Sequence, residues 1–312
     1  MPNPHRSETV RAYAALAIGV LCIGCSAIFV KLAGIPGPAS AFYRMLISGA
    51  ALVPWRLAKG GVWPSRNLVI LIVVGGLFYA LDLALWNTSL LMTSAAAATL
   101  LANNAPLWVG LGALFLFREK LTSGYWTGLC VALAGMALLM GLDAWRHLSF
   151  NLGELLAIGA SVAYAAYLLT TQRARAHVDT LTFMTVSAIA SIAILWVANL
   201  SLGTPLTGYS SRSWWALVGL GLFSQLGGWL AINHALGHLR AAHVSVSLLG
   251  QAVVTALLAM PLLGEFPAAN QVGGGLLVLA GIYLVNRRTA PKEELREAAE
   301  LPPAGSGEPY GN

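Results

Sequence analysis

The chain has 312 residues, of which 57% are hydrophobic and 10% are charged, and its mean hydropathy is +0.72. One soluble core of this length cannot bury so much apolar surface, so the composition excludes an ordinary soluble globular protein and indicates that lipid surrounds most of the chain. The formal charge of +6 does not point to a nucleic-acid partner, because the basic residues are spread over the ends of apolar segments instead of gathering on one face.

Apolar runs of about twenty residues, the length that crosses a bilayer as a helix, recur along the chain. Ten spans are expected, at 12–32, 38–57, 68–87, 94–117, 122–141, 152–171, 180–200, 213–233, 243–263 and 267–286. The sequence therefore predicts an all-α integral membrane protein with ten transmembrane helices. It also predicts a cytoplasmic amino-terminal segment at 1–11 and, from its charged and Pro/Gly-containing composition, a disordered cytoplasmic tail at 287–312.

The positions of Lys and Arg predict the orientation in the membrane. If the amino terminus is cytoplasmic, most of the 18 basic residues lie on that side: Arg6, Arg11, Arg56, Lys59, Arg66, Arg118, Lys120, Arg173, Arg175, Arg240, Arg287, Arg288, Lys292 and Arg296. The other side has only Lys31, Arg146 and Arg212, and Arg44 lies inside a span. This asymmetry predicts a multi-pass protein of the inner (cytoplasmic) membrane with both termini in the cytoplasm.

One stretch of the chain occurs twice, because residues 85–119 match residues 231–265 at a constant offset of 146 positions. The matched pairs in and beyond this stretch include Asn87 and Asn233, Glu119 and Glu265, Gly128 and Gly274, and Gly135 and Gly281. Such a run of matches indicates an internal duplication into repeats at 12–141 and 152–286. Because five spans is an odd number, the second copy must enter the membrane upside down. Inverted repeats are typical of secondary transporters, whose substrate site lies near the midplane between the halves.

Two charged residues, Arg44 and Asp82, fall inside expected spans at similar depths in the outer half of the membrane. An unpaired charge there is costly, so each must face water, the other residue or a ligand. One interpretation is a structural ion pair or an interfacial position. The other is that both line an outer vestibule and meet the charged ends of a zwitterionic substrate.

Polar and aromatic residues also fall near the midplane of several expected spans. The candidates for the lining of a central cavity are Tyr79, Asn103, Asn104, Tyr164, Gln225, Ser247 and Gln251. Each could instead form an interhelical hydrogen bond, and their shared depth favours the cavity. Pro106 predicts a kink or hinge in its helix, whereas the second copy has Ala252 at that place and gives no such signal. Trp108 and Trp229 lie deeper than the other tryptophans and could wall the cytoplasmic half of the cavity, but packing against lipid is the expected use.

The small residues, the mid-helix proline, the Glu before the fifth span and the following glycines together carry a family resemblance. In the first copy they are Ala95, Ala96, Pro106, Glu119, Gly128 and Gly135, and in the second Ala241, Ala242, Glu265, Gly274 and Gly281. This pattern resembles two tandem EamA domains of the drug/metabolite transporter (DMT) superfamily over about 12–286, and is most similar to YddG-type amino-acid exporters. The resemblance implies that the outermost helix of each copy packs at the periphery of a central cavity. Glu119 and Glu265 are interpreted as structural residues that favour a helix amino end.

These patterns together predict a monomeric secondary transporter that exports amino acids or related small metabolites by alternating access. An exporter of drugs, nucleotide-type or other metabolites, a channel and a non-transporting scaffold stay open as alternatives. An enzyme is not expected, because the spans contain no nucleophile–base motif, no grouped acidic pair and no metal-ligand motif, and no cofactor is expected. Protons are one candidate coupling ion, and the titratable candidates are Asp82, Glu154, His234, His238 and His243. The histidines fall near cytoplasmic span ends, where interfacial solvation is their expected role, so uncoupled facilitated diffusion stays open beside proton antiport.

Overall fold

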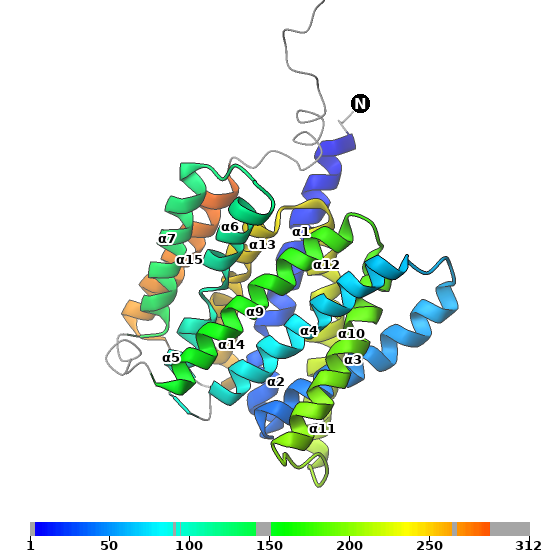
Figure 1. Cartoon of the computed structure of the whole chain (residues 1–312). Coiled ribbons are helices and arrows are strands. Elements are labelled where there is room, and N and C mark those ends of the chain that lie inside the picture. Colours follow the sequence, from blue (N-terminus) through cyan, green and yellow to red (C-terminus); the bar gives the residue numbers. More distant parts are fainter. Residues whose placement is uncertain (1–3, 90–91, 94, 142–150, 264–266, 288–312) are drawn as a thin grey trace, which may run out of the picture.

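The computed structural model describes residues 4–89, 92–93, 95–141, 151–263 and 267–287, and every regular element among them is a helix (Figure 1). The helices of the first copy are α1 (Pro4–Gly24), α2 (Ser26–Ala33), α3 (Gly37–Lys59), α4 (Arg66–Ser89), α5 (Ala95–Ala102), α6 (Ala105–Leu116) and α7 (Ser123–Leu139). Those of the second copy are α9 (Leu152–Arg175), α10 (Thr180–Ser201), α11 (Ser211–Gly219), η1 (Leu220–Gly228), α12 (Trp229–His238), α13 (Ala241–Leu248), α14 (Gly250–Leu263) and α15 (Ala269–Asn286). Residues 288–312 of the predicted tail and Glu265 lie outside the described residues.

The helices confirm an all-helical membrane protein. Within the described residues, eight helices or pairs of joined helices are long and apolar enough to cross a bilayer. The helix α7 is apolar but has only 17 residues, and α3 has 23 residues but includes Arg44, Arg56 and Lys59. The expected count of ten spans is therefore met in part, and the full number stays a prediction.

Three expected spans are interrupted helices, and the first of them breaks between the end of α1 at Gly24 and the start of α2 at Ser26. In the first copy α5 ends at Ala102 and α6 starts at Ala105, directly before Pro106, which lacks the N–H that a continuous helix needs. In the second copy α13 ends at Leu248 and α14 starts at Gly250, although this copy has no matching proline. A break there was not indicated by the sequence. The poor helix propensity of glycine gives a reason for it.

The two copies interlock, since helices of one copy pack mainly against helices of the other. The helix α4 packs on α9 and α10, and the equivalent pair η1–α12 packs on α1 and α3. Because α9 and α10 are the repeat equivalents of α1 and α3, the contacts of α4 with the second copy match those of η1–α12 with the first copy. This reciprocity is the pattern that a pseudo-two-fold axis produces.

The outermost helices of the copies, α7 and α15, lie side by side at one edge of the molecule (Figure 1). A Cβ atom on Gly128 would lie 2.8 Å from the carbonyl oxygen of Gly281, and one on Gly135 would lie 2.7 Å from that of Gly274. Gly128 is near the start of α7 and Gly281 near the end of α15, so the equivalent helices run antiparallel. Repeats related in this way point in opposite directions across the membrane, as the odd number of spans predicts.

Candidate functional site between the two copies

A polar link joins the copies at the centre of the molecule. The Oε1 atom of Gln225 in η1 accepts a hydrogen bond from Nε of Arg44 in α3 at 2.9 Å and one from Oη of Tyr79 in α4 at 3.0 Å. Tyr79 and Gln225 are separated by the repeat offset of 146 residues. Two equivalent positions that touch each other must lie next to the pseudo-symmetry axis, so this link marks the midpoint between the copies.

The local backbone places Gln225 there. Residues Leu220–Gly228 form a π-helix, in which hydrogen bonds run from i to i+5 and the side chains turn relative to an α-helix. Such segments are frequent at functional sites. The close approach of α3 to η1 depends on Gly221, because a Cβ atom there would lie 2.7 Å from Cβ of Ile47. The missing side chain brings Arg44 within reach of Gln225.

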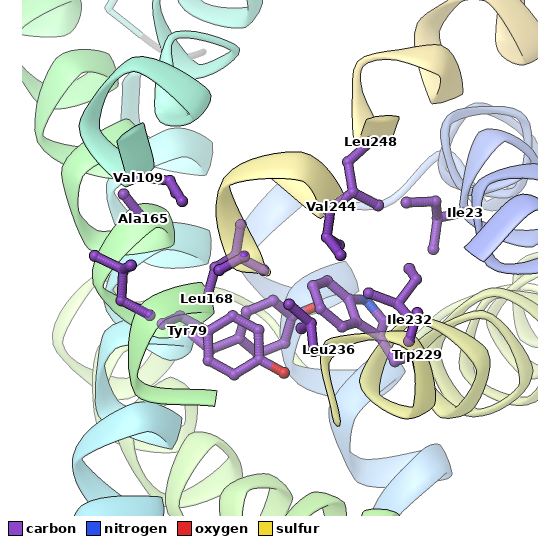
Figure 2. Close-up of a cluster of buried hydrophobic side chains, with 14 of the residues drawn as sticks. Ile23, Tyr79, Val109, Ala165, Leu168, Trp229, Ile232, Leu236, Val244 and Leu248 are labelled. Carbon is purple, nitrogen blue, oxygen red and sulfur yellow. The ribbon is translucent and has the colours of Figure 1, made fainter. Parts of the chain in front are cut away.

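Aromatic rings surround this link. The ring centroid of Tyr79 lies 4.7 Å from that of Tyr167 and 5.2 Å from that of Trp229, and Trp229 lies 5.3 Å from Tyr167. Tyr164 joins the edge of the group, 6.2 Å from Trp229. Figure 2 shows Trp229 beside Tyr79 among buried side chains. Trp229 is only 4% exposed, so the expectation that it packs against lipid is wrong. Trp108 is half-buried, and its indole N–H donates to Ser161 at 2.8 Å.

A small pocket lies beside the link and has room for about one water molecule. Its lining comes from both copies: Met45, Ser48, Leu52, Tyr79, Tyr167, Met184, Ser187, Ala188, Gln225, Trp229 and Asn233. The sequence led us to expect a larger water-filled cavity. In this conformation apolar side chains such as Met45, Leu52 and Met184 fill that space. The described residues therefore represent a closed state of the centre.

The structure gathers only part of the predicted cavity residues. Arg44, Tyr79 and Gln225 are bonded to one another, and Tyr164 belongs to the surrounding rings. Asp82 follows Tyr79 by one turn and interacts electrostatically with Arg44 without a direct ion pair.

Of the nine predicted cavity residues, all of them described, Tyr79 and Gln225 line the central pocket. Four others belong neither to the pocket nor to the polar link and its surrounding rings. Asn103 and Asn104 lie at the α5–α6 break, where their amides donate to carbonyls of the preceding turn. Ser247 donates to the carbonyl of His243 and accepts from Asn286, and Gln251 is half-buried near the start of α14. Sequence depth alone could not separate these positions from the central ones, because it does not say towards which neighbour a helix face turns.

A second link between the copies was missed in the sequence. A carboxylate oxygen of Glu119 accepts from the Gln172 amide at 2.9 Å, and the other lies 3.7 Å from Nε of Arg240. Both charged side chains are less than a fifth exposed, at 15% and 17%. The Gln172 oxygen in turn accepts from the N–H of Ala241. We name Glu119, Gln172 and Arg240 the latch.

The latch corrects the interpretation of Glu119 as a residue that serves a helix amino end. The cap of α7 is Thr122, whose hydroxyl accepts from the N–H of Tyr125 at 3.3 Å. Glu119 instead turns towards the second copy, and its neighbour Arg118 has φ of 54°. Only this non-glycine residue of the described chain has a positive φ, a costly conformation that shapes the loop around Glu119.

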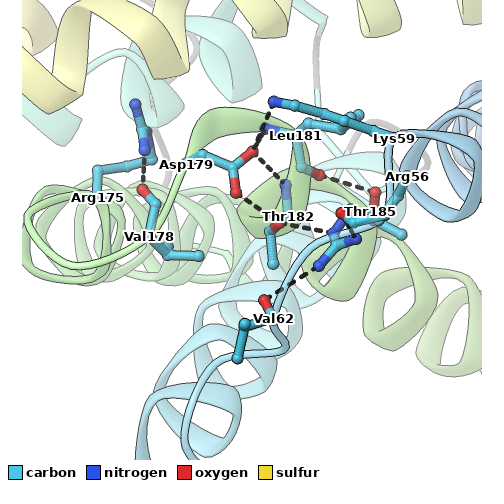
Figure 3. A network of polar contacts seen from close by, with 10 residues as sticks. Arg56, Lys59, Val62, Arg175, Val178, Asp179, Leu181, Thr182 and Thr185 are labelled. Carbon is cyan, nitrogen blue, oxygen red and sulfur yellow. Dashed lines mark hydrogen bonds and ion pairs between the residues drawn. The ribbon is translucent and has the colours of Figure 1, made fainter.

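A polar network on the same side of the predicted membrane surrounds the start of α10 (Figure 3). Asp179 caps α10 through the N–H groups of Leu181 and Thr182, and its carboxylate also accepts from the Thr182 hydroxyl at 2.6 Å. Lys59 lies 3.8 Å away. Partial burial acts to raise the pKa of the Asp179 carboxyl, but these hydrogen bonds and the Lys59 charge outweigh it and hold the pKa below its ordinary value.

We expect Asp179→Ala to lower the free energy of unfolding by about 1 kcal/mol at neutral pH, because the cap of α10 is lost. Asp179→Asn keeps a side-chain oxygen that can cap α10, so it should lower the free energy of unfolding by only a few tenths of the Asp179→Ala effect. A carboxyl with a lowered folded-state pKa contributes stability above its unfolded pKa of about 3.9 and loses it as pH falls through the folded value. Thermal unfolding in detergent should therefore show that the difference in unfolding free energy between wild type and Asp179→Asn becomes smaller below about pH 4. A difference that grows in acid would contradict this assignment.

The antiparallel copies, the interrupted helices and a central link with contributions from both halves define a polytopic membrane protein of the inverted-repeat transporter class. The chain belongs to the EamA-like transporter family, whose profile matches residues 10–141 and again 151–287. It is thus a tandem EamA protein of the DMT superfamily, and membership of this family supports the prediction that it is not an enzyme.

Relatives of known or assigned function that resemble this chain include exporters. The chain is 27% identical over 260 residues to the pseudopaline exporter CntI of Pseudomonas aeruginosa, which covers 82% of this chain and 88% of that protein. It is 27% identical to a probable terminal-alkyne amino-acid exporter of Streptantibioticus cattleyicolor, over 75% of this chain and 78% of the relative. One solved crystal structure, described only as that of a protein, covers 91% of this chain and 98% of its own with a TM-score of 0.73 and 21% identity, and so supports the fold.

Proposed function

We propose that the protein exports amino acids or closely related small carboxylates across the cytoplasmic membrane by alternating access. The observation that supports this best is the position of Arg44, a half-buried cation that is hydrogen-bonded across the repeat interface to the neutral Gln225. A guanidinium that is hydrogen-bonded to a neutral partner can exchange that partner for a carboxylate, with which it forms stronger, charge-assisted hydrogen bonds. Two relatives carry names of exporters, one of them of an amino acid.

In this proposal Gln225 holds Arg44 until substrate arrives. The substrate carboxylate takes the place of the Gln225 oxygen, and the apolar part of the substrate lies against Tyr79, Tyr164 and Tyr167. Because Arg44 and Gln225 belong to different copies, the exchange also releases one contact between the halves. Substrate binding and separation of the halves are then coupled, which alternating access requires. Pro106 and the α5–α6 break serve as a hinge.

The latch controls access from the side predicted to be cytoplasmic. It ties the α6–α7 loop of the first copy to the second copy through one ion pair, to Arg240, and one hydrogen bond, from Gln172. A further hydrogen bond, from the N–H of Ala241 to Gln172, joins α9 to the start of α13 within the second copy. The repeat equivalents of Gln172 and Arg240 are Ser26 and Ser94, which carry no charge. A charged latch is therefore encoded on one side, which biases the protein towards closure on the cytoplasmic side.

We expect Glu119→Gln or Arg240→Gln to weaken that closure by about 1 kcal/mol, which is about a fivefold change in population. The measurement uses Leu52→Cys as a reporter in the pocket, in a background without Cys22, Cys25 and Cys130. Its labelling by a membrane-impermeant maleimide in inside-out vesicles should be about five times faster in either variant. The swap of Glu119→Arg with Arg240→Glu should restore slow labelling. Equal rates in all variants would remove the latch from the mechanism.

The proposed function is tested by flux into proteoliposomes that contain the purified protein. Saturable counterflow of amino acids is expected for a carrier, whereas a channel gives non-saturating flux and a scaffold gives none. Dissipation of the proton gradient then separates the two modes of coupling: flux is unchanged for facilitated diffusion and collapses for obligate proton antiport. The topology is checked by labelling, which should place both termini in the cytoplasm.

A further inference from the structure

Two buried polar atoms of residues that line the central pocket have no hydrogen-bond partner within the described part of the chain. They are Nε1 of Trp229 and Oδ1 of Asn233. Trp229 is 4% exposed and Asn233 is fully buried, and both residues line the pocket. Buried polar groups are nearly always paired, so two unpaired atoms in one pocket call for a bound group that satisfies them.

The chemistry of this pair is well determined. The Asn233 amide nitrogen donates to the carbonyl of Trp229 at 2.8 Å, which leaves Oδ1 as a pure acceptor. The indole N–H of Trp229 is a pure donor. The hydroxyl of Tyr79 lies near the Trp229 side chain, and the hydroxyl of Tyr167 lies near the Asn233 side chain. Neither hydroxyl forms a hydrogen bond of ordinary geometry with Nε1 of Trp229 or Oδ1 of Asn233. The proton of Tyr79 is already directed to Gln225.

A group that satisfies both atoms must accept one hydrogen bond and donate another. A hydroxyl group or a primary carboxamide does both. A carboxylate cannot donate, an ammonium group cannot accept, and an alkyl group does neither. Trp229 and Asn233 are one helical turn apart in α12, and Gln225 lies one turn before them. A substrate whose carboxylate meets Arg44 beside Gln225 would therefore place its other end near this pair.

We propose that the pair Trp229–Asn233 recognises a neutral hydroxyl or carboxamide group in the side chain of the substrate. This inference rests on the proposed function and narrows its substrate class to small carboxylates that carry such a group. In the closed state the pocket has room for about one water molecule, which offers the same donor and acceptor. The substrate group displaces it when the halves part and the pocket widens.

Isosteric substrates test the proposal without any mutation. Threonine and valine have the same shape, as do asparagine and leucine, and only the first of each pair carries a hydroxyl or carboxamide. A site built for such a group rejects the analogue that lacks it, because its own polar atoms then stay unpaired. In wild-type proteoliposomes kcat/KM should favour the polar member of at least one pair by tenfold or more. Equal or greater values for both valine and leucine would overturn the proposal and assign the pair of atoms to water alone.

The variants Asn233→Leu and Trp229→Phe should bring that ratio towards one while apolar substrates are still carried. Asn87→Leu is the matched control, because Asn87 is the repeat equivalent of Asn233 and makes the same bond to the carbonyl four residues before it, at 2.6 Å. Asn87 does not line the pocket, so the ratio of kcat/KM between polar and apolar substrates should be the same in Asn87→Leu as in wild type. An unchanged ratio in both pocket variants contradicts the proposal. Saturable flux of other amino acids but of none of these four would overturn this inference alone, whereas saturable flux of no amino acid would overturn the proposed function.

Discussion

Replacement of Arg44 by methionine should raise the KM for carboxylate substrates by about thirtyfold, the equivalent of about 2 kcal/mol. Among the residues with described positions, the guanidinium is the one charged group bonded to Gln225, and methionine keeps much of its volume without charge. Gln225 keeps its hydrogen bond from Tyr79 in this variant, so the fold should survive. Arg44→Lys keeps the charge but loses the forked donor geometry, and we expect a smaller loss of about fivefold.

The experiment compares each amino acid with its decarboxylated amine in counterflow assays. A carboxylate partner at Arg44 predicts that Arg44→Met abolishes the preference for the acid, so that the two compounds compete equally. Arg212→Met is the control, because Arg212 is exposed at the start of α11 and should leave the preference unchanged. If Arg44→Met keeps wild-type flux and preference, Arg44 is a structural residue and the substrate carboxylate binds elsewhere.

The fold was predictable because its signals are repeated many times. Length and hydropathy locate the spans, and the matched glycines at 128, 135, 274 and 281 mark a close helix contact even without coordinates. The breaks were predictable in part. Pro106 predicts the break between α5 and α6, because proline lacks the N–H that a continuous helix needs. The break before Gly250 depends on the low helix propensity of glycine, a weaker effect that tertiary packing can override in either direction.

The site was less predictable, because it depends on which helix faces meet. Depth in the expected spans selected Tyr79 and Gln225, which are hydrogen-bonded to each other, and the repeat offset between them was visible in the sequence. The same argument selected Asn103 and Gln251, which lie elsewhere. Trp229 was misjudged because a tryptophan deep in a span fits lipid and interior equally well by composition. The latch was missed because its partners are far apart in sequence and each is an ordinary interfacial residue by itself.

A single methyl group at Gly274 should destabilise the protein by about 3 kcal/mol or more. A Cβ atom there would lie 2.7 Å from the carbonyl oxygen of Gly135 and even closer to the backbone of α7. A main-chain atom cannot move aside as a flexible side chain can, so α7 and α15 would have to separate.

The adjacent residue supplies the control. A Cβ atom on Gly273 meets no other atom within 4 Å, and Gly273→Ala should be neutral or stabilise α15 by up to about 1 kcal/mol, because alanine has the better helix propensity. Unfolding in detergent, followed by tryptophan fluorescence or circular dichroism, should thus move in opposite directions for two substitutions one position apart. Since Gly274 and Gly135 belong to different copies, a loss confined to Gly274→Ala means that the contact of α7 with α15 holds the antiparallel repeats together. Equal effects at both positions would mean that the helices yield at this contact, and the stability of the repeat interface would then have to come from the interlocked inner helices.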